Sequence, residues 1–477
     1  MTLWSRLWTL TCVFLAAWMF APLFPAATGA AQAQETPATA PAAAASLRAG
    51  FARTDLTPTV GMEIPGGFNK NFSTGVHDPL WAEAAYFSNG TVTLALVGVD
   101  LITVTEEMVQ EARAQAEARC GIPAANILIG ASHTHNGGPV DSCYHVERDD
   151  AYCMFAAGRI ADAVVKASEA AVAARVGYGL GQESGVGYNR RFRMKDGTIR
   201  THPGKMNPDI VAPAGPIDPD VAVIAAEDVE GRLLGCIVNF ALHGTTMSGN
   251  LLSADWPFYL RETVRGGLGS DIGVVFLNGA CGDVTQVDNL NPRPGEFGEA
   301  WARRAGMSVG AVALNVLAKM EFVPDAPLGV TSETLALPIR DLGNSDEELV
   351  RREAPGIGLG TGDDIYLKEA ALVRAMKAQS PTVAVEVQAM RIGDAGIASN
   401  PAEFFCELGL AVKRGSPWKP TMVVELANGC CGYVGTSESY LGGGYEVRTS
   451  RCSYLPAGSG EQIANASARL LCQLAGE

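Results

Sequence analysis

The fold is decided by residues 126–139, which read NILIGASHTHNGGP. The apolar run at 126–131 is flanked by Gly and Pro, a pattern that predicts a buried strand ending in a glycine-rich turn. His133 and His135 follow this strand end, and residues two apart on a strand share a face, so we expect both imidazoles to point to the same side. His243 ends a second apolar run at 236–242, and the chain has only 6 histidines. Histidines at the ends of core strands are typical of a catalytic metal site in an α/β fold.

Outward from this stretch the chain alternates strand-like and helix-like patterns. The strand patterns lie at 92–100, 126–131, 221–226, 233–242 and 271–277, and the helix patterns lie at 106–118, 151–174 and 298–319. Further strands are predicted at 383–391, 396–398 and 422–426. Such alternation predicts an α/β fold with a mixed, partly parallel β-sheet flanked by helices.

We expect one large domain over residues 48–458. Acidic and glycine-rich pieces at 341–382 break the alternation, and we interpret this segment as an insertion that forms a lid. Residues 459–477 are predicted to form a helical C-terminal tail. The sequence does not determine the oligomeric state.

The N-terminus and the charge favour an exported protein. Residues 1–33 combine Arg6, an apolar stretch at 7–23 and the small-residue site Ala31-Gln32-Ala33, which is typical of a signal peptide. Residues 34–47 are predicted to be a low-complexity leader. The formal net charge of −15 argues against nucleic acid as a partner. We therefore expect a secreted or periplasmic protein without stable membrane insertion.

The cysteines permit disulfides in such a compartment. The chain has 11 cysteines, one of which is Cys12 in the signal peptide. Candidate pairs are Cys143 with Cys153, and either Cys430 or Cys431 with Cys452. The connectivity is not readable from the sequence.

Polar residues follow nearly every predicted strand, as expected for one convergent pocket. They are Asp100, His133, His135, His243, Asp255, Asp283, Glu403, Tyr433 and Tyr445. Two histidines and a glutamate suit zinc with an open coordination position, where the ion activates a water. Asp100, Asp255 and Asp283 are more typical of supporting or turn carboxylates.

These residues, in this order, resemble the neutral or alkaline non-lysosomal ceramidases. The resemblance covers the zinc-hydrolase domain of that family, from about Gly50 to Tyr445. It rests on His133 to Gly137, Asn189-Arg190, Asn239 to His243, Gly282 to Thr285, Pro401 to Phe404, and the spacing of Tyr433 and Tyr445. Two departures are that Thr285 replaces a serine of the family, and that we expect the family's C-terminal β-sandwich domain to be lacking.

The resemblance implies a role for each matching residue. The zinc ligands would be His133, His243, Glu403 and Tyr433. The residues facing the substrate's amide would be His135, Arg190 and Tyr445. Gly66 would lie near the polar head of the substrate, and the hydroxyl of Thr285 would also contact the substrate. Glu403 or a nearby carboxylate would help to take a proton from the attacking water, and His135 would protonate the leaving amine.

Ordinary structural roles remain open for several of these residues. His243 suits a core, Glu403 suits the start of a helix, Tyr433 suits a loop, and Arg190 suits the surface. The function expected is an exported zinc-dependent amidohydrolase of ceramidase type, acting on a small-molecule or lipid amide such as an N-acylsphingosine. The alternatives are a metal hydrolase for another small acylated substrate and a non-catalytic exported binding protein.

Overall fold

The structure is a computed structural model that describes residues 47–353 and 363–476. The predicted signal peptide at 1–33 and nearly all of the leader at 34–47 lie outside the described residues. The described part forms one compact unit. None of the helices within these ranges combines the length and the apolar composition that spanning a bilayer requires.

The larger of two main sheets has eight strands. Their spatial order is β14 (Gly273–Asn278), β12 (Leu233–Phe240), β11 (Asp220–Asp228), β6 (Val172–Gln182), β1 (Arg48–Asp55), β3 (Trp81–Ser88), β4 (Thr93–Val99) and β5 (Ile127–Ala131). The outer pairs β12–β14 and β4–β5 are parallel, and the pairs between them are antiparallel. This confirms the predicted mixed, partly parallel sheet.

A second sheet has four strands, in the order β16 (Leu328–Pro338), β17 (Thr382–Ile392), β18 (Ala395–Ser399) and β20 (Thr421–Val424). Apolar side chains from both sheets share one buried cluster, which includes Leu96, Leu128, Ile237, Met390 and Val424. At one point the larger sheet approaches itself closely, because Gly98 has no side chain and a Cβ there would lie 2.1 Å from the carbonyl oxygen of Phe276.

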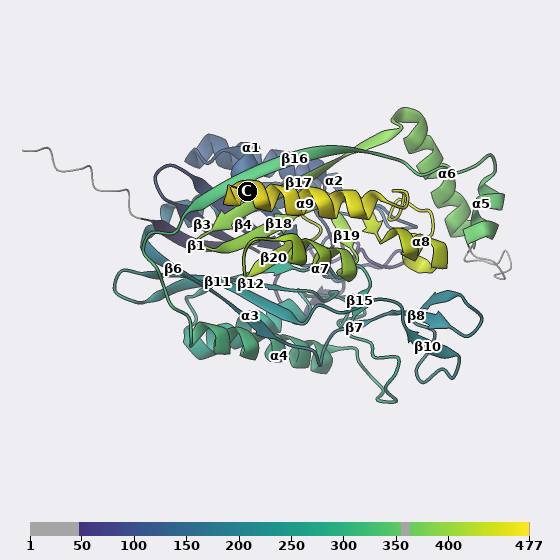
Figure 1. Cartoon of the computed structure of the whole chain (residues 1–477), viewed down its shortest axis with the longest axis horizontal. Coiled ribbons are helices and arrows are strands. Elements are labelled where there is room, and N and C mark those ends of the chain that lie inside the picture. The colour runs from purple at the N-terminus through teal and green to yellow at the C-terminus, as the bar shows by residue number, and fades with distance from the viewer. Residues whose placement is uncertain (1–46, 354–362, 477) are drawn as a thin grey trace, which may run out of the picture. The chain divides into compact units, whose positions relative to one another are not determined.

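Helices cover both sheets (Figure 1). α1 (Glu106–Cys120) and α2 (Asp150–Glu169) pack together, and α2 lies on β1 and β3. α3 (Trp256–Leu268) packs on α4 (Glu299–Leu317), which contacts β6 and β11. α9 (Ser459–Ala475) lies across β16, β17 and β18 and contacts α7 (Cys406–Gly415). The flanking helices predicted from the sequence are thus present.

The remaining elements are short or lie between these layers. They are β2 (Gly75–Val76), β7 (Tyr188–Asn189), β8 (Arg191–Met194), β9 (Ile199–Thr201), β10 (Ile210–Pro213), β13 (Leu251–Leu252), β15 (Val284–Thr285), β19 (Ala402–Phe404), β21 (Gly432–Val434), α5 (Asp346–Glu353), α6 (Asp363–Gln379), α8 (Ser437–Gly442), and the 3₁₀ turns η1 (Ala124–Asn126) and η2 (Tyr445–Val447).

Some boundaries differ from the sequence prediction. The helix predicted to reach residue 174 ends at Glu169, and Val172 already belongs to β6. The local alanine-rich sequence favours a helix, but pairing of β6 with β11 overrides that preference. The segment predicted as an insertion, 341–382, connects the hairpin partners β16 and β17 and carries α5 and α6, with residues 354–362 outside the description. Its action as a lid stays a prediction.

The C-terminal helix is more than a tail. Ile463, Leu470 and Leu471 of α9 are buried in one cluster with Val412 of α7 and Val387 of β17. Because an amphipathic helix gains most of its stability from burying such a face, we interpret α9 as a structural part of the second sheet's core.

Candidate metal centre and active site

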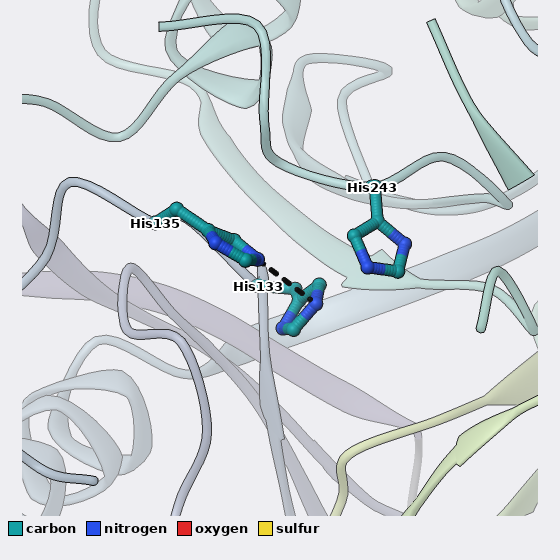
Figure 2. A group of neighbouring side chains, drawn as sticks. All are labelled: His133, His135 and His243. Atoms are coloured by element: carbon teal, nitrogen blue, oxygen red, sulfur yellow. Dashed lines mark hydrogen bonds between the residues drawn. The ribbon is translucent and has the colours of Figure 1, made fainter. Parts of the chain in front are cut away.

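Three histidine side chains converge where the loops after β5 and β12 lie side by side (Figure 2). Thr134 pairs with Gly244 in a parallel bridge, and the backbone N–H of His135 donates to the carbonyl of Gly244 at 3.0 Å. This pairing brings His133 and His135 next to His243. One ring nitrogen from each of the three lies within 4.8 Å of the other two.

The two histidines of the first loop meet for a different reason from the predicted strand alternation. β5 ends at Ala131, and His133 has a left-handed backbone with a φ of 64°. A turn therefore brings Nε2 of His135 to 3.3 Å from Nε2 of His133. A non-glycine residue in this region costs about 1–3 kcal/mol, so the surrounding contacts must hold it there. One of them is the bond from the N–H of His133 to the carbonyl of Leu101 at 3.0 Å.

Each of the three rings directs its other nitrogen, Nδ1, at a backbone carbonyl oxygen. The pairs are His133 with Ile102 at 2.8 Å, His243 with Cys281 at 2.8 Å, and His135 with Gly66 at 3.0 Å. A carbonyl only accepts hydrogen bonds, so Nδ1 carries the proton and Nε2 of a neutral ring is a lone pair. Such carbonyl partners are the usual way in which proteins fix a metal-binding tautomer.

Glu403 brings a carboxylate to the same point. It lies on β19, which pairs with β21 so that Glu403 stands opposite Tyr433. Its Oε2 is 3.3 Å from Nε2 of His133 and 3.6 Å from Nε2 of His243. This oxygen is buried and has no hydrogen-bond partner among the described residues. A buried carboxylate oxygen without a donor is costly, which indicates that a cation belongs at this position.

The chemistry of this donor set fits zinc. Imidazole nitrogens and a carboxylate oxygen are standard zinc ligands, and Tyr433 adds a phenol oxygen beside Glu403.

The ionisable groups of this site shift one another's pKa values. Burial lowers the pKa of His133 but Glu403 raises it, with a net rise, whereas burial and His133 lower the pKa of His135 to about 3. Burial and Glu403 raise the pKa of the Tyr433 phenol well above its usual value.

Arg190 is buried beside these groups and is held by an acidic partner. Its Nε donates to Glu446 at 2.7 Å, and its Nη1 lies 3.3 Å from Nε2 of His243. The guanidinium carbon lies 5.4 Å and 5.8 Å from the ring centres of Tyr433 and Tyr445. Arg190 therefore connects the histidine group to both predicted tyrosines, and the surface role left open by the sequence is wrong.

A small cavity, the histidine cavity, lies over this group, with a volume of about 70 Å³. Its walls include Gly66, His133, His135, Asp141, Tyr144, Glu403, Tyr433, Tyr445 and Arg451. The hydroxyl of Tyr144 donates to that of Tyr445 at 3.4 Å. Gly66 has a φ of 91°, and a Cβ there would lie 2.4 Å from Nδ1 of His135. Only glycine at this position allows the observed contact between its carbonyl and the ring.

A disulfide joins two walls of the histidine cavity. It pairs Cys143 with Cys452, across 309 residues of sequence. Both candidate pairings from the sequence are therefore wrong, and Cys153, Cys430 and Cys431 are free. The sequence candidates relied on nearness along the chain, whereas the fold brings the loop after β5 against the loop after η2.

Thr285 stands apart from the group. It is buried on β15, its hydroxyl accepts a bond from the N–H of Val287 at 3.4 Å, and it does not line the histidine cavity. The three aspartates that the sequence analysis assigned to supporting roles accept hydrogen bonds from neighbouring backbone and side-chain groups, as expected. Asp100 pairs with Arg261, Asp255 caps α3, and Asp283 accepts from Asn189 and Cys406.

Three carboxylates near the site were not found from the sequence. Glu446 holds Arg190, Asp141 lines the histidine cavity, and Glu425 accepts from the backbone N–H groups of Cys281 and Phe404. Glu425 thereby ties the residue next to Glu403 to the residue whose carbonyl orients His243. The sequence held a signal for Glu446, because this residue directly follows Tyr445. It held one for Asp141 as well, because this residue lies in the same loop as His135.

The chain is similar to known proteins in sequence and in structure. No family model matches the chain. Neutral ceramidase from Pseudomonas aeruginosa is 25% identical over 472 residues, which cover 84% of this chain and 68% of that protein. The crystal structure of neutral ceramidase from Pseudomonas aeruginosa has a TM-score of 0.69 at 19% identity, covering 90% of this chain and 75% of that one. A ceramidase complexed with C2 has a TM-score of 0.66 at 20% identity, with the same coverage. The chain is therefore a homologue of neutral ceramidase, which it resembles in sequence and in fold.

Proposed function

We propose that the protein is an exported zinc-dependent hydrolase that cleaves an amide bond in an N-acyl compound, in the manner of a ceramidase. The observation that carries the proposal is the grouping of three imidazoles, two of which, His133 and His243, lie 3.3 Å and 3.6 Å from the buried, unpartnered Oε2 of Glu403. Homology to neutral ceramidase supports the reaction class. Export rests on the sequence of residues 1–33 alone.

The proposed ligands are His133, His243 and Glu403, with Tyr433 as the fourth. A zinc ion bound there supplies Lewis acidity and lowers the pKa of a water. Backbone carbonyls keep both imidazoles in the tautomer that presents Nε2, and Arg190 balances the negative charge of Glu446.

His135 is the proposed proton carrier. Its pKa, lowered to about 3, leaves the ring neutral at pH 7, so Nε2 first accepts a proton from the attacking water. The same nitrogen then gives that proton to the departing amine. The carbonyl of Gly66 holds Nδ1 and so keeps Nε2 directed into the cavity.

The Tyr445 hydroxyl is the proposed donor to the oxygen on which negative charge develops. It lines the histidine cavity, and Tyr144 donates to it, which leaves its own proton free to point at substrate. Arg190 lies against the rings of Tyr433 and Tyr445 and positions both.

The test is metal content together with amide hydrolysis. Mature protein should hold about one zinc per chain and lose its amidase activity on chelation. His133→Ala and His243→Ala should each lose the metal, whereas His145→Ala, an exposed histidine, should keep it. Retention of full metal by either of the first two variants would remove that residue from the ligand set. Binding of N-acyl compounds without metal and without turnover would favour a binding protein.

A further inference from the structure

Asp141 is a half-buried carboxylate in the wall of the histidine cavity. Among residues 47–353 and 363–476 it forms no ion pair, because Arg451 on the same wall is taken by Glu369 through bonds of 2.9 Å and 2.7 Å. Burial raises the pKa of Asp141 to about 6, although the backbone N–H of Ser142 opposes the rise. Asp141 is half-buried, and an ionised carboxylate only accepts hydrogen bonds, so it can receive a donor group from a ligand in the cavity.

Asp141 also faces a second, larger cavity. This cavity has a volume of about 560 Å³ and shares Thr103, Asp141, Cys430 and Arg451 with the histidine cavity. Small-molecule sites typically measure about 300–1,000 Å³, so the histidine cavity alone accommodates only the reacting group. The adjoining second cavity offers room for the rest of a substrate.

The second cavity is charged as well as large. Glu107 and Arg148 form one ion pair in its wall, and Arg113 and Glu386 form another, the latter two-pronged with bonds of 2.9 Å and 2.8 Å. These charges satisfy each other, whereas Asp141 does not take part in either pair. Apolar side chains such as Val109, Val140 and Met376 line the rest of this cavity, so it offers polar partners beside an apolar surface.

We propose that Asp141 determines specificity by accepting a hydrogen bond from a hydroxyl or amino group a few bonds from the scissile amide, on a substrate that extends into the second cavity. This inference rests on the proposed function. It names the substrate class as N-acyl compounds with a polar arm, as opposed to amides with two plain alkyl arms.

The experiment compares hexanoyl amides of matched size. In three of the compounds the amine is butylamine, aminopropanol or diaminopropane. In the fourth compound the hydroxyl is on the acyl arm instead. We expect kcat/KM to favour at least one donor-bearing compound about 10- to 100-fold over the butylamide, as a hydrogen bond to a charged group implies. Asp141→Asn keeps an acceptor oxygen but loses the charge, so it should lower that ratio about three- to tenfold. The preferred compound shows whether the donor is a hydroxyl or an ammonium group, and on which arm.

Asp149→Asn is the matched control. Asp149 lies in the same loop and caps α2, which asparagine does equally well, and it lines neither cavity. Its substrate ratio should equal that of the unmodified protein. A ratio that falls equally in both variants, or a ratio unchanged in Asp141→Asn, overturns the inference.

A second variant tests the larger cavity. Ala384 is exposed, lines the second cavity and stands opposite Ala336 on β16, which does not line it. Ala384→Trp should lower kcat/KM for the preferred compound about tenfold or more, and Ala336→Trp should leave it within about twofold. Equal effects of both substitutions would exclude the second cavity as the place of the polar arm.

The experiment distinguishes failure of the inference from failure of the proposed function. Hydrolysis of all four amides at similar rates overturns the inference and keeps the function. No hydrolysis of any of them overturns the function, and calorimetry with zinc-loaded protein then decides the inference. Tighter binding of aminopropanol or diaminopropane than of butylamine, weakened in Asp141→Asn, supports it, and equal or undetectable binding overturns it.

Discussion

Glu446 accepts a hydrogen bond from Nε of Arg190 at 2.7 Å, and both side chains are buried. The pair is the link between the loop that carries Tyr445 and the histidine group, because Arg190 also reaches His243. Removing one partner of a buried pair leaves the other charge without compensation.

We therefore expect Glu446→Ala to lower the free energy of unfolding by about 3–5 kcal/mol. Glu446→Gln keeps an acceptor oxygen and should cost less. Urea unfolding of metal-free protein measures both. The control is Glu438→Gln, which breaks an exposed pair with Arg193 and should change the free energy by less than about 1 kcal/mol. Equal effects at the two sites would show that Glu446 does not hold Arg190 in place.

Tyr445→Phe should retain zinc and stability but reduce kcat about 10²- to 10³-fold, as loss of one donor to the developing oxyanion does. Stopped assays on the same amides, with metal analysis of each sample, provide the measurement. Tyr188→Phe removes an exposed hydroxyl that bonds to Gly185 and should leave kcat unchanged. An unaltered kcat in Tyr445→Phe would exclude the tyrosine from the reaction.

Asp141 should make stability depend on pH. Its pKa of about 6, against a reference value of 3.8, means that the folded state binds this proton more tightly than the unfolded state. The stabilising contribution of the protonated group is full below the reference value and is lost as the pH rises through the folded pKa. In chelated protein at neutral pH, Asp141→Asn should therefore increase the free energy of unfolding by about 1–3 kcal/mol, and near pH 4 it should change it little. Thermal melts at both pH values test this, and a gain of the same size at both would refute it.

Thr285→Val should reduce the rate by about tenfold or less. The hydroxyl contacts the backbone of Val287 and does not line the histidine cavity, so it supports the local turn and does not face the reaction. Thr285→Ser keeps the hydroxyl and serves as the comparison. Abolished turnover in the valine variant, with an acyl-threonine adduct in quenched reactions, would instead make Thr285 a nucleophile.

Much of this site was predictable from the sequence because short motifs carry it. The loop of His133 and His135, the loop of His243 after β12 and the short strand with Glu403 each follow an apolar run. Homology to neutral ceramidase supports the resemblance from which their roles were inferred. The roles themselves stay predictions until metal and activity are measured.

Other features required the three-dimensional structure. β1 and β3 are rich in alanine and glycine or carry mixed polarity, so their place in the centre of the sheet depends on pairing with distant strands. The Cys143–Cys452 disulfide depends on two loops that meet only in the fold. Asp141 belongs to no sequence motif. Only the fold shows that it lines both cavities without an ion pair among the described residues.

The origin of the site in widely separated parts of the chain has a consequence for the order of synthesis. The two histidine loops emerge from the ribosome long before Glu403 and Tyr433, and Cys143 precedes its partner Cys452 by 309 residues. A growing chain thus contains the two histidine loops well before the carboxylate and the phenol of the proposed ligand set. Completion of the proposed ligand set, like closure of the disulfide, is therefore postponed until nearly the whole polypeptide has been made.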